Sequence, residues 1–219
     1  MTARRFDLLI FDWDGTLLDS VDWIVMCLQN AAADSALPVP TAESARAVIG
    51  LSLDAALRTV FPDIQGEQVE PLMAAYRRHF FTRPLTAEDL FEGVEAMLGE
   101  LRDEGFRLAI ATGKARRGLD RALEQTGLAP YFETTRCADE TASKPDPTML
   151  HEILTVTGAA PQRTVMIGDS LHDLRMAASA GIAGIAVSTG ANSRAELAAL
   201  NPLTCLNRVV ELPSIVRAG

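Results

Sequence analysis

The hexapeptide Phe11-Asp12-Trp13-Asp14-Gly15-Thr16 decides how the rest of this chain is interpreted. It follows an apolar run from Phe6, which is typical of a buried strand despite the charge at Asp7. Because successive side chains of an extended strand alternate between faces, Asp12 and Asp14 can point the same way. Two adjacent carboxylates repel strongly unless a cation or a shared proton relieves them. We therefore favour a chemical role for the pair over a simple Asx-Gly turn.

Three later segments carry further polar groups that could join this pair. Ala109–Lys114 is an apolar strand that ends in a hydroxyl, a glycine and a cation, and Ser143–Pro147 is a proline-rich loop with a lysine. Val165–Asp173 is a third apolar strand followed by two more carboxylates. Because the carboxyl ends of parallel strands in an α/β sheet meet at one crevice, the four segments are expected to converge.

The pattern of elements predicts an α/β fold. Helical patterns and no strand occupy residues 20–85, over 20–31, 42–49, 54–61 and 65–81. After residue 93, strands expected at 107–112, 132–136, 164–167, 183–188 and near 205 alternate with helices at 93–105, 116–127, 147–158, 171–181, 194–200 and 209–216. This alternation predicts a Rossmann-like, doubly wound parallel sheet with helices on both faces. We predict a catalytic core of residues 1–18 and 88–219 and an inserted, all-helical cap of residues 19–87.

The order and spacing of the four motifs closely resemble the haloacid-dehalogenase superfamily of phosphotransferases, over the whole chain. A carboxylate that attacks phosphorus forms an aspartyl-phosphate, which divides one hard displacement into two easier ones. Asp12 is the expected nucleophile, and Asp14 is the expected general acid that later becomes the base for water. The resemblance implies the same two roles for these positions.

A phosphate monoester and the Asp12 carboxylate repel each other by about 4 kcal/mol for each unit-charge pair near 4 Å, at an effective dielectric near 20. A cation is required to offset this repulsion. Mg²⁺ suits hard oxygen ligands best. We expect Asp12 and Asp169 to hold it, together with the backbone carbonyl of Asp14, which the resemblance implies. Asp173 lies about one helical turn beyond Asp169 and is expected to support the site from behind these ligands.

The remaining candidates would contact the phosphoryl group. Lys144 would neutralise carboxylate charge, and Thr112 with the backbone N–H groups of Gly113 and Lys114 would bind the phosphoryl oxygens. The chain has 18 arginines but only two lysines, Lys114 and Lys144, and both fall in these loops. Plainer alternatives stay open: either lysine as a solvated cation at a helix start, Thr112 as a helix cap and Asp173 as a solvated residue of a first helical turn.

The sequence indicates no catalytic or metal-binding role for the three histidines. His172 is expected to be an exposed helix residue, and His79 and His151 to lie in the core or on the surface. The aromatic residues Phe11 and Trp23 are more typical of core than of a pocket lining.

Composition limits the partners. The 219 residues carry a formal net charge of −9 with a pI near 4.8, which argues against nucleic acid and anionic membranes. The three cysteines fit no CxxC pattern and are expected to be free thiols, some of them buried, in a reducing compartment. The apolar stretch near the N-terminus is too short for a signal peptide, so we expect a soluble cytoplasmic protein, monomer or homodimer.

Details of the sequence narrow the reaction within the family resembled. Its dehalogenases lack an aspartate two positions after the nucleophile, where Asp14 stands here. Its phosphonate hydrolases use a cap lysine, and residues 20–85 contain none. Its hexose-phosphate mutases carry a histidine early in the cap, where Ile24 stands. After these exclusions, the resemblance implies a magnesium-dependent phosphatase for a small phosphorylated metabolite, most similar to the phosphoglycolate-phosphatase group.

Pyrophosphatase, nucleotidase and sugar-phosphate phosphatase stay open as alternatives, as do transfer to an acceptor other than water and a non-catalytic phosphate-sensing protein. The cap is expected to close over the substrate about hinges near residues 18–20 and 84–89. Arg46, Gly50, Ser52 and Arg58 are the candidates for cap residues that set specificity.

Overall fold

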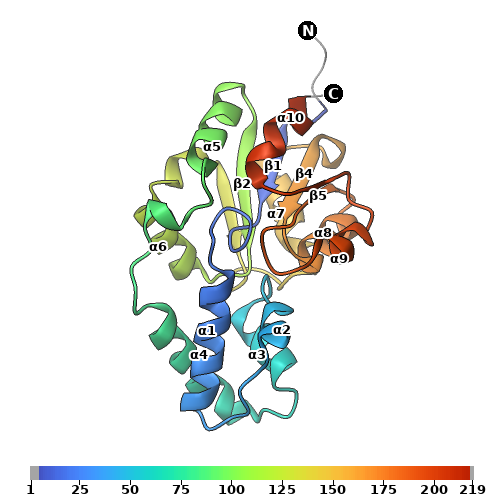
Figure 1. The fold of residues 1–219 in the computed structure, drawn as a ribbon. Coiled ribbons are helices and arrows are strands. Elements are labelled where there is room, and N and C mark those ends of the chain that lie inside the picture. Colours follow the sequence, from blue (N-terminus) through green and yellow to red (C-terminus); the bar gives the residue numbers. More distant parts are fainter. Residues whose placement is uncertain (1–4, 218–219) are drawn as a thin grey trace.

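The computed structural model describes residues 5–217, and one parallel sheet organises them (Figure 1). Its six strands run in the order β3-β2-β1-β4-β5-β6, and all five pairings are parallel. The strands are β1 (Leu8–Phe11), β2 (Arg107–Thr112), β3 (Thr134–Cys137), β4 (Thr164–Gly168), β5 (Ala183–Val187) and β6 (Cys205–Leu206). The chain builds outward from β1 on one side and from β4 on the other, so the strand order reverses between them. The predicted doubly wound α/β fold is confirmed.

The alternating pleat of β1 explains why both faces of the sheet are buried. Leu9 and Phe11 join a cluster with α5 (Val94–Asp103) and α6 (Arg116–Thr126). Leu8 and Ile10 join a separate cluster with α7 (Thr148–Thr157) and α8 (Leu171–Ser179). A strand buried on both faces needs apolar residues at every position, as the run Leu8–Phe11 provides.

Helices cover both faces of the core. They are α5 (Val94–Asp103), α6 (Arg116–Thr126), α7 (Thr148–Thr157), α8 (Leu171–Ser179), α9 (Arg194–Ala198) and α10 (Leu212–Arg217). Short 3₁₀ turns lie at η1 (Ala87–Asp89), η2 (Ala129–Tyr131), η3 (Pro161–Arg163) and η4 (Val209–Glu211). No helix among residues 5–217 is long and apolar enough to cross a membrane.

The helical insert lies at the end of the sheet where β1 ends, at the bottom of Figure 1. It consists of α1 (Val21–Asp34), α2 (Ala42–Arg46), α3 (Leu53–Val60) and α4 (Gly66–Phe80). Their apolar faces form a cluster of their own, with Leu28, Leu57 and Leu72 nearly fully buried. This separate core supports the predicted cap, whose exact boundaries stay a prediction.

The two connections between insert and sheet are joined to each other. The Asp19 N–H donates to the Asp89 carbonyl at 2.8 Å, and the Phe91 N–H donates to the Leu17 carbonyl at 3.1 Å. Leu18 and Leu90 form an isolated antiparallel bridge between the same two segments. The chain therefore leaves and re-enters the core at one point.

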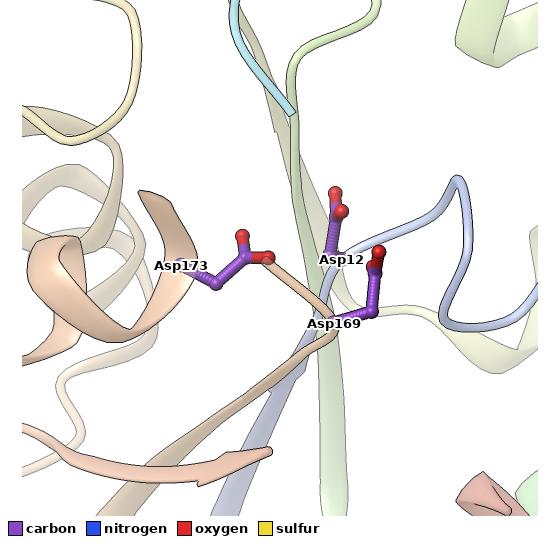
Figure 2. A group of neighbouring side chains, drawn as sticks. All are labelled: Asp12, Asp169 and Asp173. Carbon is purple, nitrogen blue, oxygen red and sulfur yellow. The ribbon is translucent and has the colours of Figure 1, made fainter. Parts of the chain in front are cut away.

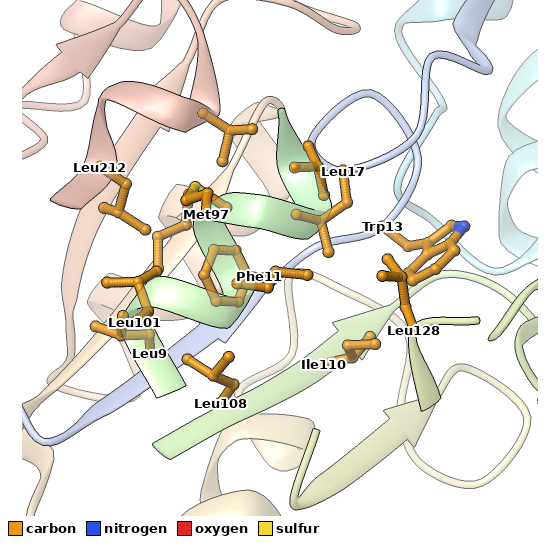
Figure 3. Close-up of a cluster of buried hydrophobic side chains, with 14 of the residues drawn as sticks. Leu9, Phe11, Trp13, Leu17, Met97, Leu101, Leu108, Ile110, Leu128 and Leu212 are labelled. Carbon is orange, nitrogen blue, oxygen red and sulfur yellow. The ribbon is translucent and has the colours of Figure 1, made fainter. Parts of the chain in front are cut away.

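The loop that follows β1 is anchored in the core by its apolar residues. Trp13 and Leu17 are fully buried and belong to the same cluster as Phe11 and Leu128 (Figure 3). Burial of an aromatic and a leucine on one side of the loop directs the intervening polar residues to the other side. Phe11 is a core residue, as expected.

Most predicted elements agree with the structure within a few residues. The strand at 107–112 has the predicted bounds, whereas the helix expected over 42–49 ends at Arg46 and continues as turns. The third strand starts at Thr134, because a 3₁₀ turn at Ala129–Tyr131 precedes it.

Candidate active site

Two aspartates leave the ends of the adjacent central strands β1 and β4. Phe11 pairs with Ile167, and the Asp12 N–H donates to the Ile167 carbonyl at 2.9 Å. Asp12 is 1% exposed and Asp169 is fully buried. Their carboxylates project in the same direction, and Asp173 points toward them from α8 (Figure 2).

Lys144 joins two of these three carboxylates. Its Nζ donates to Asp12 Oδ1 at 2.7 Å and to Asp173 Oδ1 at 2.6 Å. The side chains of Lys144 and Asp173 are fully buried. A buried ammonium between two buried carboxylates is a costly arrangement unless its charges are matched, so it is unusual in a purely structural core.

Burial and mutual repulsion perturb the pKa values of the group. Burial raises the pKa of Asp12 well above its ordinary value; Lys144 opposes this shift, and Asp173 and Asp169 add to it. Burial, with Asp173 next, raises the pKa of Asp169 to about 7. Burial alone would lower the pKa of Lys144, but Asp12 and Asp173 outweigh it and raise that pKa. Three ionised carboxylates would therefore carry more negative charge than one lysine offsets.

The donor set fits a hard divalent cation. Oxygen atoms of Asp12, Asp169 and Asp173 all lie within 4.8 Å of one another. Three buried carboxylates beside a single lysine favour occupation by a cation, and oxygen-only ligands are those that Mg²⁺ prefers. The identity of the metal and the part played by the Asp14 carbonyl stay predictions.

Asp169 is held by two groups for which the sequence predicted no role, the Thr16 hydroxyl and the Ala191 N–H. Thr16 Oγ1 donates to Asp169 Oδ1 and the Ala191 N–H donates to Asp169 Oδ2, both at 2.7 Å. Gly15, at a φ of +80°, allows this approach, because a Cβ there would lie 2.5 Å from Asp169 Oδ2. The Gly-Thr turn after β1 therefore positions a carboxylate from β4.

Asp173 does not occupy a solvated position at the start of its helix. Its Oδ2 accepts hydrogen bonds from the Ser170 hydroxyl at 2.6 Å and the Ser170 N–H at 3.1 Å. The Ser170 hydroxyl in turn accepts from the Asp173 N–H, which completes a capping box at the start of α8. This fixes the carboxylate against Lys144; the supporting role of Asp173 stays a prediction.

Asp14 lies apart from that group of carboxylates and has its own partners. Ser20 Oγ donates to Asp14 Oδ1 at 2.7 Å, and Lys114 Nζ lies 3.0 Å from Asp14 Oδ2. Burial raises the pKa of Tyr76 in the insert, and the Asp14 carboxylate adds to that shift. Asp14 therefore lies at the contact between core and insert.

The loop after β2 faces the insert directly. Thr112 is fully buried, and its hydroxyl accepts from the Lys114 N–H at 3.2 Å, so it does not cap α6, which begins at Arg116. Gly113 packs so closely that a Cβ there would lie 2.5 Å from the Gly50 carbonyl oxygen. Whether these groups bind phosphate stays a prediction.

His172 is not an exposed helix residue, which corrects the expectation from sequence. It is half-buried, and its Nε2 lies 3.1 Å from the carbonyl oxygen of Ala47 in the insert. Burial lowers the pKa of His172. Helical periodicity gave no signal for this contact, because the partner is a backbone carbonyl 125 positions earlier.

The four specificity candidates divide into two pairs. The Ser52 N–H donates to Ser143 Oγ at 2.8 Å, next to Lys144, and Gly50 faces Gly113. Arg46 pairs with Asp22, and Arg58 pairs with Asp54. Both arginine pairs are largely exposed and internal to the insert.

Other expectations concern single residues. His79 pairs with Asp34 at the surface of the insert, and His151 is exposed. Trp23 is half-buried and donates to the Phe80 carbonyl at 3.4 Å. The three cysteines are free thiols, two of them buried.

The sequence of the chain is similar to those of a known family of proteins. Residues 9–187 match the family described as haloacid dehalogenase-like hydrolase. The chain is 34% identical over 215 residues to "Probable phosphatase IndB" of Dickeya dadantii, covering 96% of this chain and 94% of that protein. It is 30% identical over 217 residues to phosphoglycolate phosphatase of Pseudomonas syringae, covering 94% and 78%.

Two further similarities concern a longer protein and a solved structure. The chain is 35% identical over 184 residues to tyrosine-protein kinase PtkA of Mycobacterium tuberculosis, covering 84% of this chain but 62% of that protein. A solved hydrolase from Pseudomonas syringae superimposes with a TM-score of 0.85 at 23% identity, over 95% of this chain and 96% of the other.

Proposed function

Because this chain belongs to the haloacid dehalogenase-like hydrolase family, we propose that it is a magnesium-dependent phosphatase acting on a small phosphomonoester similar to phosphoglycolate. The observation that carries the proposal is the Lys144 ammonium held between Asp12 and Asp173, with Asp169 beside them. The site can accept a dianionic phosphate only with additional positive charge, since its carboxylates outnumber its one lysine.

The proposed reaction uses the residues at the site. A carboxylate oxygen of Asp12 attacks phosphorus, the bond from phosphorus to the leaving oxygen breaks, and that oxygen takes a proton from Asp14. Water then attacks the aspartyl-phosphate while Asp14 accepts its proton, which releases phosphate and restores Asp12. When bound, Mg²⁺ would supply positive charge that screens the phosphate oxygens from the carboxylates. Asp12 and Asp169 would hold it, with Asp173 behind them.

Lys144 and the loop after β2 would bind the transferring group. Lys144 offers its charge to the phosphoryl oxygens beside Asp12, where the bond forms. Thr112 and the N–H of Gly113 lie on the neighbouring strand end, as donors for the remaining oxygens. The insert would exclude water during transfer and release the product on opening.

Phosphate release with and without Mg²⁺ tests this proposal. The substrates are p-nitrophenyl phosphate, phosphoglycolate, pyrophosphate, nucleoside monophosphates, sugar phosphates and phosphotyrosine, ranked by kcat/KM. Activity that EDTA removes and Mg²⁺ restores is the expected result, together with a hydroxylamine-labile phosphoprotein in acid-quenched samples. Turnover of the metal-free protein would contradict the site as proposed.

The other reaction classes give distinct results in the same assay. A phosphate-sensing protein would bind Mg²⁺ and phosphate without turnover of any substrate. Transfer to an acceptor other than water, which the similarity to a protein named as a kinase raises, would appear as phosphorylated product on an added alcohol, sugar or tyrosine peptide.

A further inference from the structure

Lys114 makes two contacts that connect the core to the insert. Its Nζ lies 3.0 Å from Asp14 Oδ2 and 4.6 Å from the centroid of the Phe80 ring. The side chains of Lys114 and Asp14 are only 9% and 11% exposed. An ammonium shielded from water on both sides interacts more strongly with each partner than it would at the surface.

The three partners come from three separate parts of the fold. Asp14 follows β1, Lys114 follows β2, and Phe80 is the last residue of α4 in the insert. Ser20, at the start of α1, occupies the other oxygen of Asp14. Both carboxylate oxygens of Asp14 are therefore restrained, Oδ1 by the Ser20 hydroxyl and Oδ2 by the Lys114 ammonium.

The ring of Phe80 is itself held within the insert. It stacks on Tyr76 with centroids 5.8 Å apart and an interplanar angle of 20°. The Phe80 carbonyl accepts from Trp23 Nε1 at 3.4 Å. A fixed ring can locate the lysine only when the insert lies on the core, because the ring belongs to one part and the lysine to the other.

We propose that Lys114 is a positioning residue that aims the Asp14 carboxyl at the leaving oxygen, and that Phe80 seats Lys114 when the insert closes. The inference rests on the proposed phosphatase function and adds a route by which closure assembles the proton donor. In the step affected, the phosphorus–oxygen bond breaks and the proton of Asp14 passes to the leaving oxygen, while Lys114 keeps its protons.

The test varies the pKa of the leaving group, and with it the need for a proton from Asp14. A series of substituted phenyl phosphates and an alkyl phosphate is assayed with wild type and Lys114→Met. The parameter is kcat/KM, which reports phosphoryl transfer to Asp12 and excludes the later attack of water. Leaving groups of low pKa depart without a proton, whereas alkoxides require one.

The expected result is selective. Lys114→Met should lose roughly 30-fold to 100-fold on the alkyl phosphate and less than about threefold on p-nitrophenyl phosphate, since a misplaced general acid forfeits part of the usual 10²–10⁴-fold contribution. The plot of log kcat/KM against leaving-group pKa should steepen. Phe80→Leu, which keeps an apolar side chain but removes the aromatic face, should steepen it less.

A matched control is available at the same end of α4. The Arg121 guanidinium lies 5.0 Å from the Phe81 ring centroid, so Arg121→Met removes a neighbouring cation–π contact. This variant should keep the wild-type slope. Circular dichroism checks that each variant folds, and Phe80→Leu provides the slope if Lys114→Met does not fold.

The remaining outcomes overturn one proposal or the other. An equal loss on all substrates, or a higher KM at unchanged slope, would assign Lys114 to phosphate binding and refute the positioning role. A wild-type slope in Phe80→Leu would show that Phe80, and with it the insert, does not help to position Lys114. If the wild-type protein cleaves none of the series, the proposed phosphatase function itself is refuted, independently of the role of Lys114.

Discussion

Lys144 Nζ and Asp173 Oδ1 lie 2.6 Å apart, between two side chains that are both fully buried. The lysine lies in the loop after β3 and the aspartate in the first turn of α8, which follows β4, so the contact joins two crossovers of the fold. Because Asp12 shares the same ammonium at 2.7 Å, this pair fixes the charge next to the candidate nucleophile.

Replacing Lys144 should destabilise the metal-free protein. Lys144→Met leaves the buried carboxylates of Asp12 and Asp173 without a counter-charge, and breaking a buried pair in this way costs about 3–5 kcal/mol. Urea denaturation measures the change in the free energy of unfolding. Arg208→Met is the matched control, because its pair with Glu92 is largely exposed and should contribute less than about 1 kcal/mol. Equal losses in the two variants would show that Lys144 is not stabilising this group of carboxylates.

Lys144→Arg should keep the charge but lose activity. A planar guanidinium is larger than an ammonium and cannot occupy the same space between Asp12 and Asp173. We expect kcat to fall by about 100-fold or more, the scale of losing an electrostatic contact to the transferring group. Wild-type rates on p-nitrophenyl phosphate in this variant would make Lys144 a bystander.

Asp12→Asn should abolish turnover and preserve the fold. The amide has almost the same shape as the carboxylate but cannot attack phosphorus, so kcat should fall by at least about 10⁴-fold. Phosphate release and near-ultraviolet circular dichroism are measured on the same sample. Substantial residual activity in a folded variant would remove Asp12 from the nucleophile role.

The metal-free protein should lose stability as pH rises from about 4 to about 7. Burial and then Asp173 raise the pKa of Asp169 to about 7, so the folded state retains a proton that the unfolded chain has released in this window. The loss from this group is at most about 4 kcal/mol. Urea denaturation of wild type and Asp169→Asn with EDTA isolates it, since the variant has no carboxyl to titrate.

Mg²⁺ should act in the opposite direction over the same pH range. It binds the ionised carboxylates, so the rise in Tm that it causes should be larger at pH 8 than at pH 5.5. Wild type and Asp169→Asn with the same pH dependence in EDTA would contradict the role of Asp169 in both effects.

Gly113→Ala should impair closure of the insert without harming the core. The added methyl group would lie 2.5 Å from the Gly50 carbonyl oxygen and would also meet that of Leu51. We expect kcat/KM to fall by about tenfold or more, the scale that small displacements at a catalytic site produce. Gly118→Ala is the control, because a Cβ in that part of α6 meets no atom within 4 Å. Equal activity in the two variants would place Gly113 outside the closing surface.

The sequence predicted what depends on local pattern, and failed where partners lie far along the chain. The buried run at Arg107–Thr112 has the bounds expected from its residues, because apolar periodicity and the following Gly113 are both local. Thr16 contacts Asp169, 153 positions later, and the Ala191 N–H reaches the same carboxylate. Neither a hydroxyl in a turn nor a backbone N–H carries a signal of such a partner.

The contacts between insert and core were the least predictable part. His172 was expected to be exposed, yet it contacts the Ala47 carbonyl. The cation–π contact of Lys114 with Phe80 depends on how α4 packs, which helical periodicity does not specify. Arg46 and Arg58 were reasonable candidates by charge alone, but each has an acidic partner within the insert.

The adjacent connections at Asp19 and Asp89 bear on how such a chain can change over time. Since the insert departs and returns at a single position, any segment inserted there needs only two ends that lie close together. A replacement module of another length or topology could be grafted there while the sheet beneath stays in register. Recognition of the substrate and the machinery of phosphoryl transfer can thus diversify independently within one polypeptide.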